Sequence, residues 1–247
     1  MPDITSPGQV GLWIHRTETA LNHLHDIQSL GFTYILPKLW EDGAVYGDPA
    51  AFRQLAADAA LIDLPVVPWG YSRPQEIEAQ IQVVADHLPA NAAGIVIDAE
   101  GEWEKAGVEM LAHQLCHGIA QATGHRAPLH LSSFYAPRLH PQFPYAAFLT
   151  HCESFMPQSY VEGGTPPDIV TGRTMVQAYT LAHQCGRALV PTVNDPALLP
   201  LFHTAGVAAA NVWLWDGDSC GPDSDYGVLG REPLWQPALS GFIKASG

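Results

Sequence analysis

The sequence predicts a single (β/α)8 barrel, and three observations lead to this fold class. The chain has 247 residues, close to the usual size of such a barrel, which is about 250 residues. Hydrophobic residues make up 47% of the chain and charged residues 15%, so one large core can form. Short apolar runs alternate with longer amphipathic segments, and no linker or low-complexity tract interrupts them. We therefore expect one domain over residues 1–247.

Eight apolar runs have the length and composition of strands. Strands that are buried on both faces are continuously apolar, and residues 94–97, Gly-Ile-Val-Ile, show this pattern. An open doubly wound sheet is the alternative, but the Gly-rich turn of a dinucleotide-binding unit does not follow the first run. In chain order, the expected strands are Val10–His15, Tyr34–Lys38, Pro65–Trp69, Gly94–Asp98, Leu129–Ser133, Ser154–Gln158, Ala188–Thr192 and Val212–Trp215.

Helix-compatible segments separate these runs, and several carry start signals. Asp48 and Asp195 are each followed by a proline, as expected for an N-cap before the first helical position. Residues 72–75, Ser-Arg-Pro-Gln, have the spacing of a capping box, and the last helix is expected over Pro237–Lys244. Apolar residues at helical spacing mark the first helix, at Leu21, Leu24, Ile27 and Leu30, and the fourth, at Leu111, Leu115 and Ile119.

The charge of the chain excludes two classes of partner. It has 25 acidic residues against 11 Lys plus Arg, and a net charge of −14. Nucleic acids and anionic membrane surfaces both bind clustered cations, so we expect neither as a partner. No apolar stretch reaches about 18 residues, and the N-terminus lacks the basic start and apolar run of a signal peptide. We expect a cytoplasmic location by default, or release by lysis or a dedicated secretion route.

Cysteine and histidine patterns predict neither a disulfide framework nor a metal site. The cysteines at positions 116, 152, 185 and 220 form no Cys-x-x-Cys pair, which favours buried free thiols. His113, Cys116 and His117 have a helical spacing that a metal could use, but we expect them on an outer helix away from the barrel opening. We therefore expect no metal and no cofactor.

The fourth expected strand ends in two carboxylates, and these are the candidate catalytic residues. In a barrel of this kind the active site lies at the C-terminal ends of the strands. Side chains alternate along a strand, so Asp98 and Glu100 should point the same way, into the barrel opening. Two carboxyl groups in a poorly solvated opening do not both ionise easily. One pKa should rise, which provides a general acid beside a general base or charge stabiliser.

Polar and aromatic residues at the other strand ends indicate a carbohydrate substrate. Flat aromatic faces in a groove stack on pyranose rings. Trp213 and Trp215 should share a face of the last strand and point into the barrel. Asp216, Asp218, Asp223 and Asp225 form an acidic loop, whose spacing differs from that of an EF-hand and which we interpret as a subsite wall. The expected substrate-binding residues are His15, Lys38, Trp69, Tyr71, Gln158, Tyr160, Trp215 and Asp216.

Two motifs resemble those of glycoside hydrolase families. Asp98-Ala99-Glu100 at the end of the fourth strand resembles the lysozymes of family 25 and, more loosely, the chitinases of family 18. Residues 156–160, Met-Pro-Gln-Ser-Tyr, are similar to the sixth-strand element of the chitinases, with one residue more. The resemblance implies that Glu100 is the general acid and that Asp98 helps the 2-acetamido group of the substrate to attack. It also implies that Tyr160 lies near the reacting sugar.

The chain departs from both families, and two other functions remain open. The lysozymes carry an Asp at the end of the first strand, where this chain has His15, and the approach to Asp98 lacks the further Asp residues of the chitinases. We expect hydrolysis of an N-acetylated glycan of the peptidoglycan or chitin type. The alternatives are a catalytically inactive glycan-binding barrel and a different barrel enzyme, such as an aldolase that forms a Schiff base on Lys38.

Overall fold

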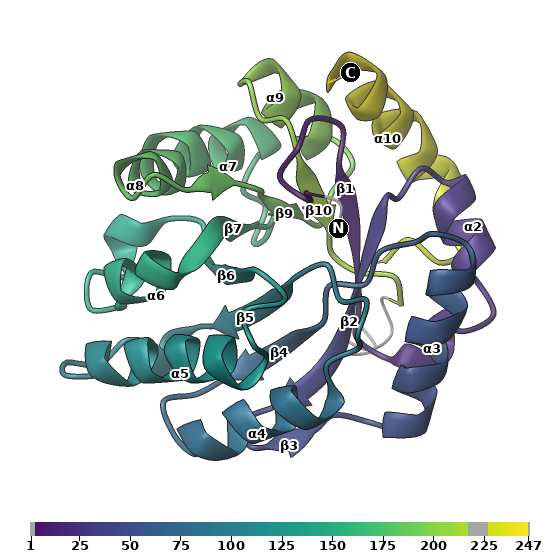
Figure 1. Cartoon of the computed structure of the whole chain (residues 1–247). Coiled ribbons are helices and arrows are strands. Elements are labelled where there is room, and N and C mark those ends of the chain that lie inside the picture. Colours follow the sequence, from purple (N-terminus) through teal and green to yellow (C-terminus); the bar gives the residue numbers. More distant parts are fainter. Residues whose placement is uncertain (1–2, 217–226, 247) are drawn as a thin grey trace.

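The computed structural model describes residues 3–216 and 227–246 and has eight parallel strands in a closed ring (Figure 1). β1 pairs with both β2 and β10, so the sheet closes on itself. This confirms the predicted (β/α)8 barrel. Around the ring the strands are β1 (Val10–Ile14), β2 (Tyr34–Glu41), β4 (Trp69–Ser72), β5 (Ile95–Ala99), β6 (Leu129–Phe134), β7 (Cys152–Ser159), β9 (Thr192–Val193) and β10 (Ala210–Val212).

Prolines explain two differences from the expected strands. β4 begins at Trp69, and before it Val66 forms only single bridges, to Ile35 and Ala92. Pro65 and Pro68 flank this stretch, and proline has no N–H to donate to a strand ladder. The seventh strand is likewise split by Pro191 into β8 (Ala188–Leu189) and β9.

The eighth strand differs most from its expected position. β10 ends at Val212, where the predicted strand was to begin, so the tryptophans at 213 and 215 lie beyond the ladder. A short antiparallel strand, β3 (Ala44–Val45), extends the sheet from β2 at the C-terminal end of the barrel.

Helices surround the strands (Figure 1). Asp48 caps α3 through the Ala50 N–H at 2.8 Å, as predicted. The capping box at 72–75 is wrong: Ser72 Oγ donates to Gln80 Oε1, and no side chain caps α4. The helices are α1 (Thr17–Ala20), α2 (Leu24–Ser29), α3 (Pro49–Leu61), α4 (Ile77–His87), α5 (Glu109–Ala122), α6 (Tyr145–His151), α7 (Pro167–Thr174), α8 (Thr180–Gln184), α9 (Leu198–Thr204) and α10 (Glu232–Ser246), with short turns η1 (Gly101–Trp103), η2 (Pro137–Leu139) and η3 (Met175–Tyr179).

Two helix boundaries also differ from those expected. α9 begins at Leu198, although Asp195 Oδ1 does accept the Ala197 N–H at 2.8 Å. α10 begins at Glu232, with Pro233 in its first turn, and therefore starts five residues before the expected Pro237. Within the described part of the chain, no helix is both long enough and apolar enough to cross a bilayer.

The core has an inner layer within the barrel and an outer layer between strands and helices. Alternate residues of each strand belong to one layer or the other. On β5, Ile95 and Ile97 pack in the outer layer, whereas Val96 packs in the inner one. Asp98 has the same parity as Val96, so it points into the barrel, as the sequence predicts. The sequence of β5 therefore determines which way the first carboxylate faces.

Candidate active site

A buried carboxylate on β5 is held by side chains from the next two strands. Asp98 is 4% exposed. Its Oδ1 accepts the Ser132 hydroxyl of β6 at 2.7 Å and the Gln158 amide of β7 at 2.9 Å. Each donor lies at the C-terminal end of its strand and has the inward parity. The barrel closure thus brings together residues that are 34 and 60 positions apart.

The Gln158 amide joins the two candidate catalytic carboxylates. Its Nε2 donates to Asp98 Oδ1 and, at 2.7 Å, to Glu100 Oε1. Because both oxygens accept from one nitrogen, the carboxyl groups lie close together at the opening of the barrel. An amide nitrogen has two N–H donors, so one side chain can satisfy both acceptors. The two carboxyl groups therefore lie on the same side of β5, at the barrel opening, as the sequence predicts.

Burial sets the electrostatics of the pair. Desolvation, followed by the charge of Glu100, raises the pKa of Asp98 well above its usual range, and the Ser132 and Gln158 hydrogen bonds only partly oppose this. Desolvation also raises the pKa of Glu100, with a smaller contribution from the neighbouring acids Glu102 and Glu162. Because burial raises the pKa of both carboxyl groups, the pair retains a proton at a pH where isolated carboxyls have lost theirs.

A second group of residues, at the end of β4 and in the segments that follow β2, β4 and β5, lies beside this pair. Tyr71 Oη donates to Glu102 Oε2 at 2.7 Å, and burial with this hydrogen bond raises the pKa of Tyr71. Arg73 forms ion pairs with Asp42 and, at 3.4 Å, with Glu102. Tyr71 was predicted from its strand-end position, but its partners lie in loops, and no motif in the sequence marked them.

Lys38 of β2 is surrounded by aromatic and polar side chains. It is 5% exposed, and its Nζ lies 2.9 Å from Glu41 Oε2 and 4.0 Å from the centre of the Tyr46 ring. The adjacent His15 has a pKa lowered to about 4, by desolvation first and then by the charge of Lys38. His15 is therefore neutral near neutral pH. The ion pair with Glu41 engages the ammonium form of Lys38, whereas Schiff-base chemistry requires the free amine.

Aromatic rings gather at the centre of the barrel opening. Trp13, Trp69 and Trp213 pack edge to face, with ring centroids 4.9–5.8 Å apart. Trp13 and Trp69 are 1% and 2% exposed, so their rings are almost covered. Trp213 and Tyr160 are partly exposed, and their ring centroids are 6.1 Å apart. Of these four rings, those of Trp213 and Tyr160 are therefore the accessible ones.

Trp215 does not line the opening, which corrects the sequence-based assignment. Its side chain is fully buried in the outer layer, where its indole Nε1 donates to the Thr19 carbonyl at 3.3 Å. Trp213 instead packs against the inner layer, so the two tryptophans do not share a face. The reason is that β10 ends at Val212, and the alternation of strand side chains does not extend past that point.

Asp216 is also buried, at 5% exposure, and burial raises its pKa. Its side chain interacts with Thr19 and Arg16, in the segment that follows β1. The other three acids of the predicted subsite wall, Asp218, Asp223 and Asp225, lie outside the described residues, as does Cys220.

A hollow of about 400 Å³ opens beside Glu100. It extends over the ends of β6 and β7 and the segment after β7. Glu100 and Gln158 contribute to its wall, so the carboxylate pair is reached from this hollow. Its lining residues are Glu100, Phe134, Tyr135, Gln158, Tyr160, Glu162 and Thr165. Sequence analysis identified the residues at 100, 158 and 160 but did not anticipate a role for Tyr135, Glu162 or Thr165.

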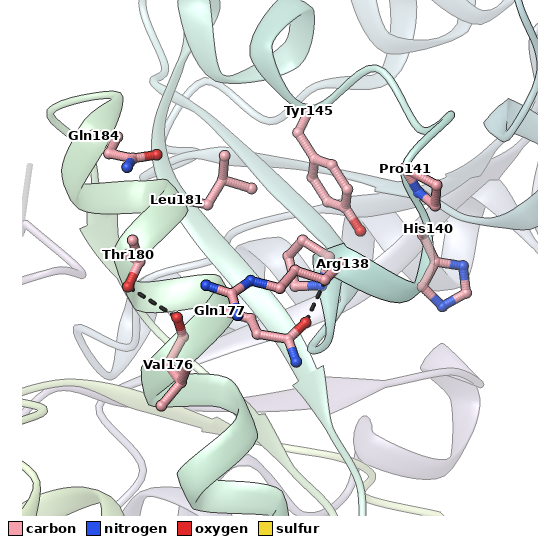
Figure 2. A pocket seen from close by; sticks show the side chains of 10 residues that line it. Arg138, His140, Pro141, Tyr145, Val176, Gln177, Thr180, Leu181 and Gln184 are labelled. Atoms are coloured by element: carbon pink, nitrogen blue, oxygen red, sulfur yellow. Dashed lines mark hydrogen bonds between the residues drawn. The ribbon is translucent and has the colours of Figure 1, made fainter.

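Figure 2 shows a second hollow, of about 330 Å³, formed by η2, the start of α6, η3 and α8. Arg138 lies across it, and its backbone N–H donates to Gln177 Oε1 at 3.0 Å. His140 lines this hollow and stacks on Phe134, with ring centroids 3.6 Å apart. This second hollow contains none of the predicted site residues.

The histidines of α5 pair with another helix. His113 Nδ1 lies 2.9 Å from His151 Nε2, at the end of α6. Cys116 and Cys152 are buried free thiols. Among residues 3–216 and 227–246, no group of three His, Cys, Asp or Glu side chains has an arrangement that could hold a metal ion.

Comparison with known proteins establishes the fold. No protein-family model and no curated protein sequence matches the chain. Among solved structures, the family 18 chitinase ChiB of Flavobacterium johnsoniae has a TM-score of 0.62 at 11% identity, over 96% of this chain and 95% of that one. The spore coat polysaccharide biosynthesis protein SpsE of Bacillus subtilis has a TM-score of 0.66 at 8% identity, over 97% and 68%.

A third similar structure belongs to another enzyme class. An HpcH/Hpal aldolase/citrate lyase family protein of Burkholderia cenocepacia has a TM-score of 0.55 at 12% identity, over 84% of this chain and 88% of that one. Glycosidases are thus among the similar barrels, together with enzymes of other chemistry. At these identities the likeness is one of fold, and function must be argued from the site.

Proposed function

We propose that this chain is a glycoside hydrolase that cleaves an N-acetylated glycan of the chitin or peptidoglycan type, with Glu100 as general acid. The observation that carries the proposal is the Gln158 amide, which joins the carboxyl groups of Asp98 and Glu100 at the C-terminal end of the barrel. A carboxyl group that has a perturbed pKa and lines a hollow, as Glu100 does, is a candidate catalytic group. Glu100 lines the hollow and is reachable by a substrate.

The raised pKa of the pair suits acid catalysis. In the first step, Glu100 gives its proton to the glycosidic oxygen while the bond from that oxygen to the anomeric carbon breaks. The oxygen of the substrate's 2-acetamido group attacks the same carbon, and a cyclic oxazolinium ion forms. Water then adds to the anomeric carbon and gives a proton to Glu100, which restores the acid and reopens the ring.

Asp98 supports this sequence by its placement. As the acetamido oxygen attacks the anomeric carbon, the acetamido nitrogen acquires positive charge. The Asp98 carboxylate can then accept a hydrogen bond from the N–H of this nitrogen. When the acetamido group binds, the proton that the pair retains is on Glu100, and Asp98 is ionised. Ser132 and Gln158 donate hydrogen bonds to Asp98 and stabilise its negative charge. Gln158 therefore keeps the two carboxyl groups in the same positions whether the proton is on Asp98 or on Glu100.

The direct test is turnover by the wild-type chain. N-acetylglucosamine oligomers and soluble peptidoglycan fragments should yield new reducing ends, detected by chromatography and mass spectrometry. Binding of the same glycans without any cleavage would identify a glycan-binding barrel instead. Borohydride trapping of a carbonyl substrate on Lys38 would identify the aldolase chemistry.

A further inference from the structure

The two sides of the candidate active site differ in whether their acids are paired with basic residues. On the β6–β7 side, the seven residues that line the hollow beside Glu100 include two acids, Glu100 and Glu162, and no base. On the other side, Lys38 within β2 pairs with Glu41, and Arg73, directly after β4, pairs with Asp42 and Glu102. Glu162 is solvent-exposed at the rim, and its charge contributes to raising the pKa of Glu100. The acids on the β2–β4 side are therefore paired with cations, whereas no basic residue lines the hollow that contains Glu162.

The positions of Asp98 and Glu100 indicate which side of the site binds the attacked sugar and which side binds the leaving sugar. Asp98 is buried in the barrel and does not line the hollow, whereas Glu100 does. Under the proposed function, the sugar that is attacked must lie over Asp98, and the leaving oxygen must lie at Glu100. The hollow beyond Glu100 is then the place for the leaving sugar.

We propose that this hollow binds the leaving sugar and selects an amino sugar, neutral or cationic, against a sugar that carries a carboxylate. The proposal rests on the glycoside hydrolase function proposed above. The rings of Phe134, Tyr135 and Tyr160 supply apolar faces for a pyranose ring, and the Glu162 carboxylate determines which substituents that ring can carry. A carboxylate on the leaving sugar would be repelled by Glu162, and an ammonium group would be attracted.

Three matched disaccharides test this charge selectivity. Each has N-acetylglucosamine on the attacked side, and the leaving sugar is glucosamine, N-acetylglucosamine or N-acetylmuramic acid. Cleavage is measured at a pH where the glucosamine amine is protonated. Because the Glu162 carboxylate is exposed, each change in the charge of the leaving sugar should alter kcat/KM by about two- to fivefold. The value of kcat/KM should be highest with glucosamine, intermediate with N-acetylglucosamine and lowest with N-acetylmuramic acid.

Glu162→Gln should reduce the differences in kcat/KM among the three disaccharides. Glu153→Gln is the matched control. Glu153 is also exposed but is the second residue of β7, at the opposite end of the barrel from the opening, so its loss should leave the ratios unchanged. Added salt should also reduce these differences in the wild type. Cleavage of all three disaccharides at equal rates, or fastest cleavage of the muramic acid compound, would overturn the inference while leaving the hydrolase function in place. Absence of cleavage for all three would instead overturn the hydrolase function on which the inference rests.

Discussion

Gln158→Leu should change the titration of the catalytic pair. The Gln158 amide donates to Asp98 Oδ1 at 2.9 Å and to Glu100 Oε1 at 2.7 Å, and each hydrogen bond favours the ionised form of its acceptor. Leucine has a similar size but no donor. A hydrogen bond to a charged group contributes about 1.5–3 kcal/mol, which corresponds to about one to two pH units. The pKa values of both carboxyls should therefore rise further.

The assay is a carboxyl 13C NMR titration of the wild type and the variant, for which no substrate is required. The matched control is Gln114→Leu, because Gln114 also donates to a carboxylate, Glu78 Oε1 at 2.8 Å, but on the outer helices. That control should leave the titration of Asp98 and Glu100 unchanged. Unshifted titration curves in a folded Gln158→Leu chain would refute the bridging role of the amide.

Three further predictions concern stability and binding. Asp98→Asn should raise the Tm at pH 7, and this gain should disappear near pH 4. The pKa of Asp98 is raised in the folded state, so the wild type loses stability as the pH rises above the ordinary carboxyl pKa. Calorimetry of both proteins at the two pH values measures this difference. Trp215→Ala should destabilise the fold by about 3–5 kcal/mol in urea denaturation, because its ring is fully buried in the outer layer, and a loss below about 1 kcal/mol would contradict that placement. Trp213→Ala should weaken glycan binding, measured by calorimetric titration, with a smaller stability loss, and unchanged affinity would remove Trp213 from the site.

The parts of the fold that follow strand periodicity could be predicted from the sequence. The apolar run before Asp98 determined both the strand and the direction of the carboxylate, because side chains alternate at a period of two. The same rule failed for Trp215, since it lies three residues past the end of β10. Nothing local marks a strand end there, and the two strands that pair with β10, β1 and β9, both lie earlier in the chain, β1 by about 200 residues.

Contacts between distant segments could not be predicted. That Gln158 reaches both acids depends on the register between β6 and β7, which pairs Phe134 with Gln158, and on the register of β5 with β6. The Arg73 ion pairs and the role of Glu162 depend on loop conformations, which have no periodicity to read. The sequence could therefore identify the candidate catalytic acids and their strand, but the residues that contact them could be identified only from the closed barrel.

The central claim is that Glu100 delivers a proton to a glycosidic oxygen with Asp98 as its charged partner. The most direct test compares Glu100→Gln and Asp98→Asn on a natural glycan and on an aryl glycoside whose leaving group needs little protonation. Glu100→Gln should slow the natural glycan by about 10²–10⁴-fold and the aryl glycoside far less, because only the first requires the acid. Asp98→Asn should slow both. Equal, small losses on both substrates for both folded variants would contradict the account and place the chemistry on other residues.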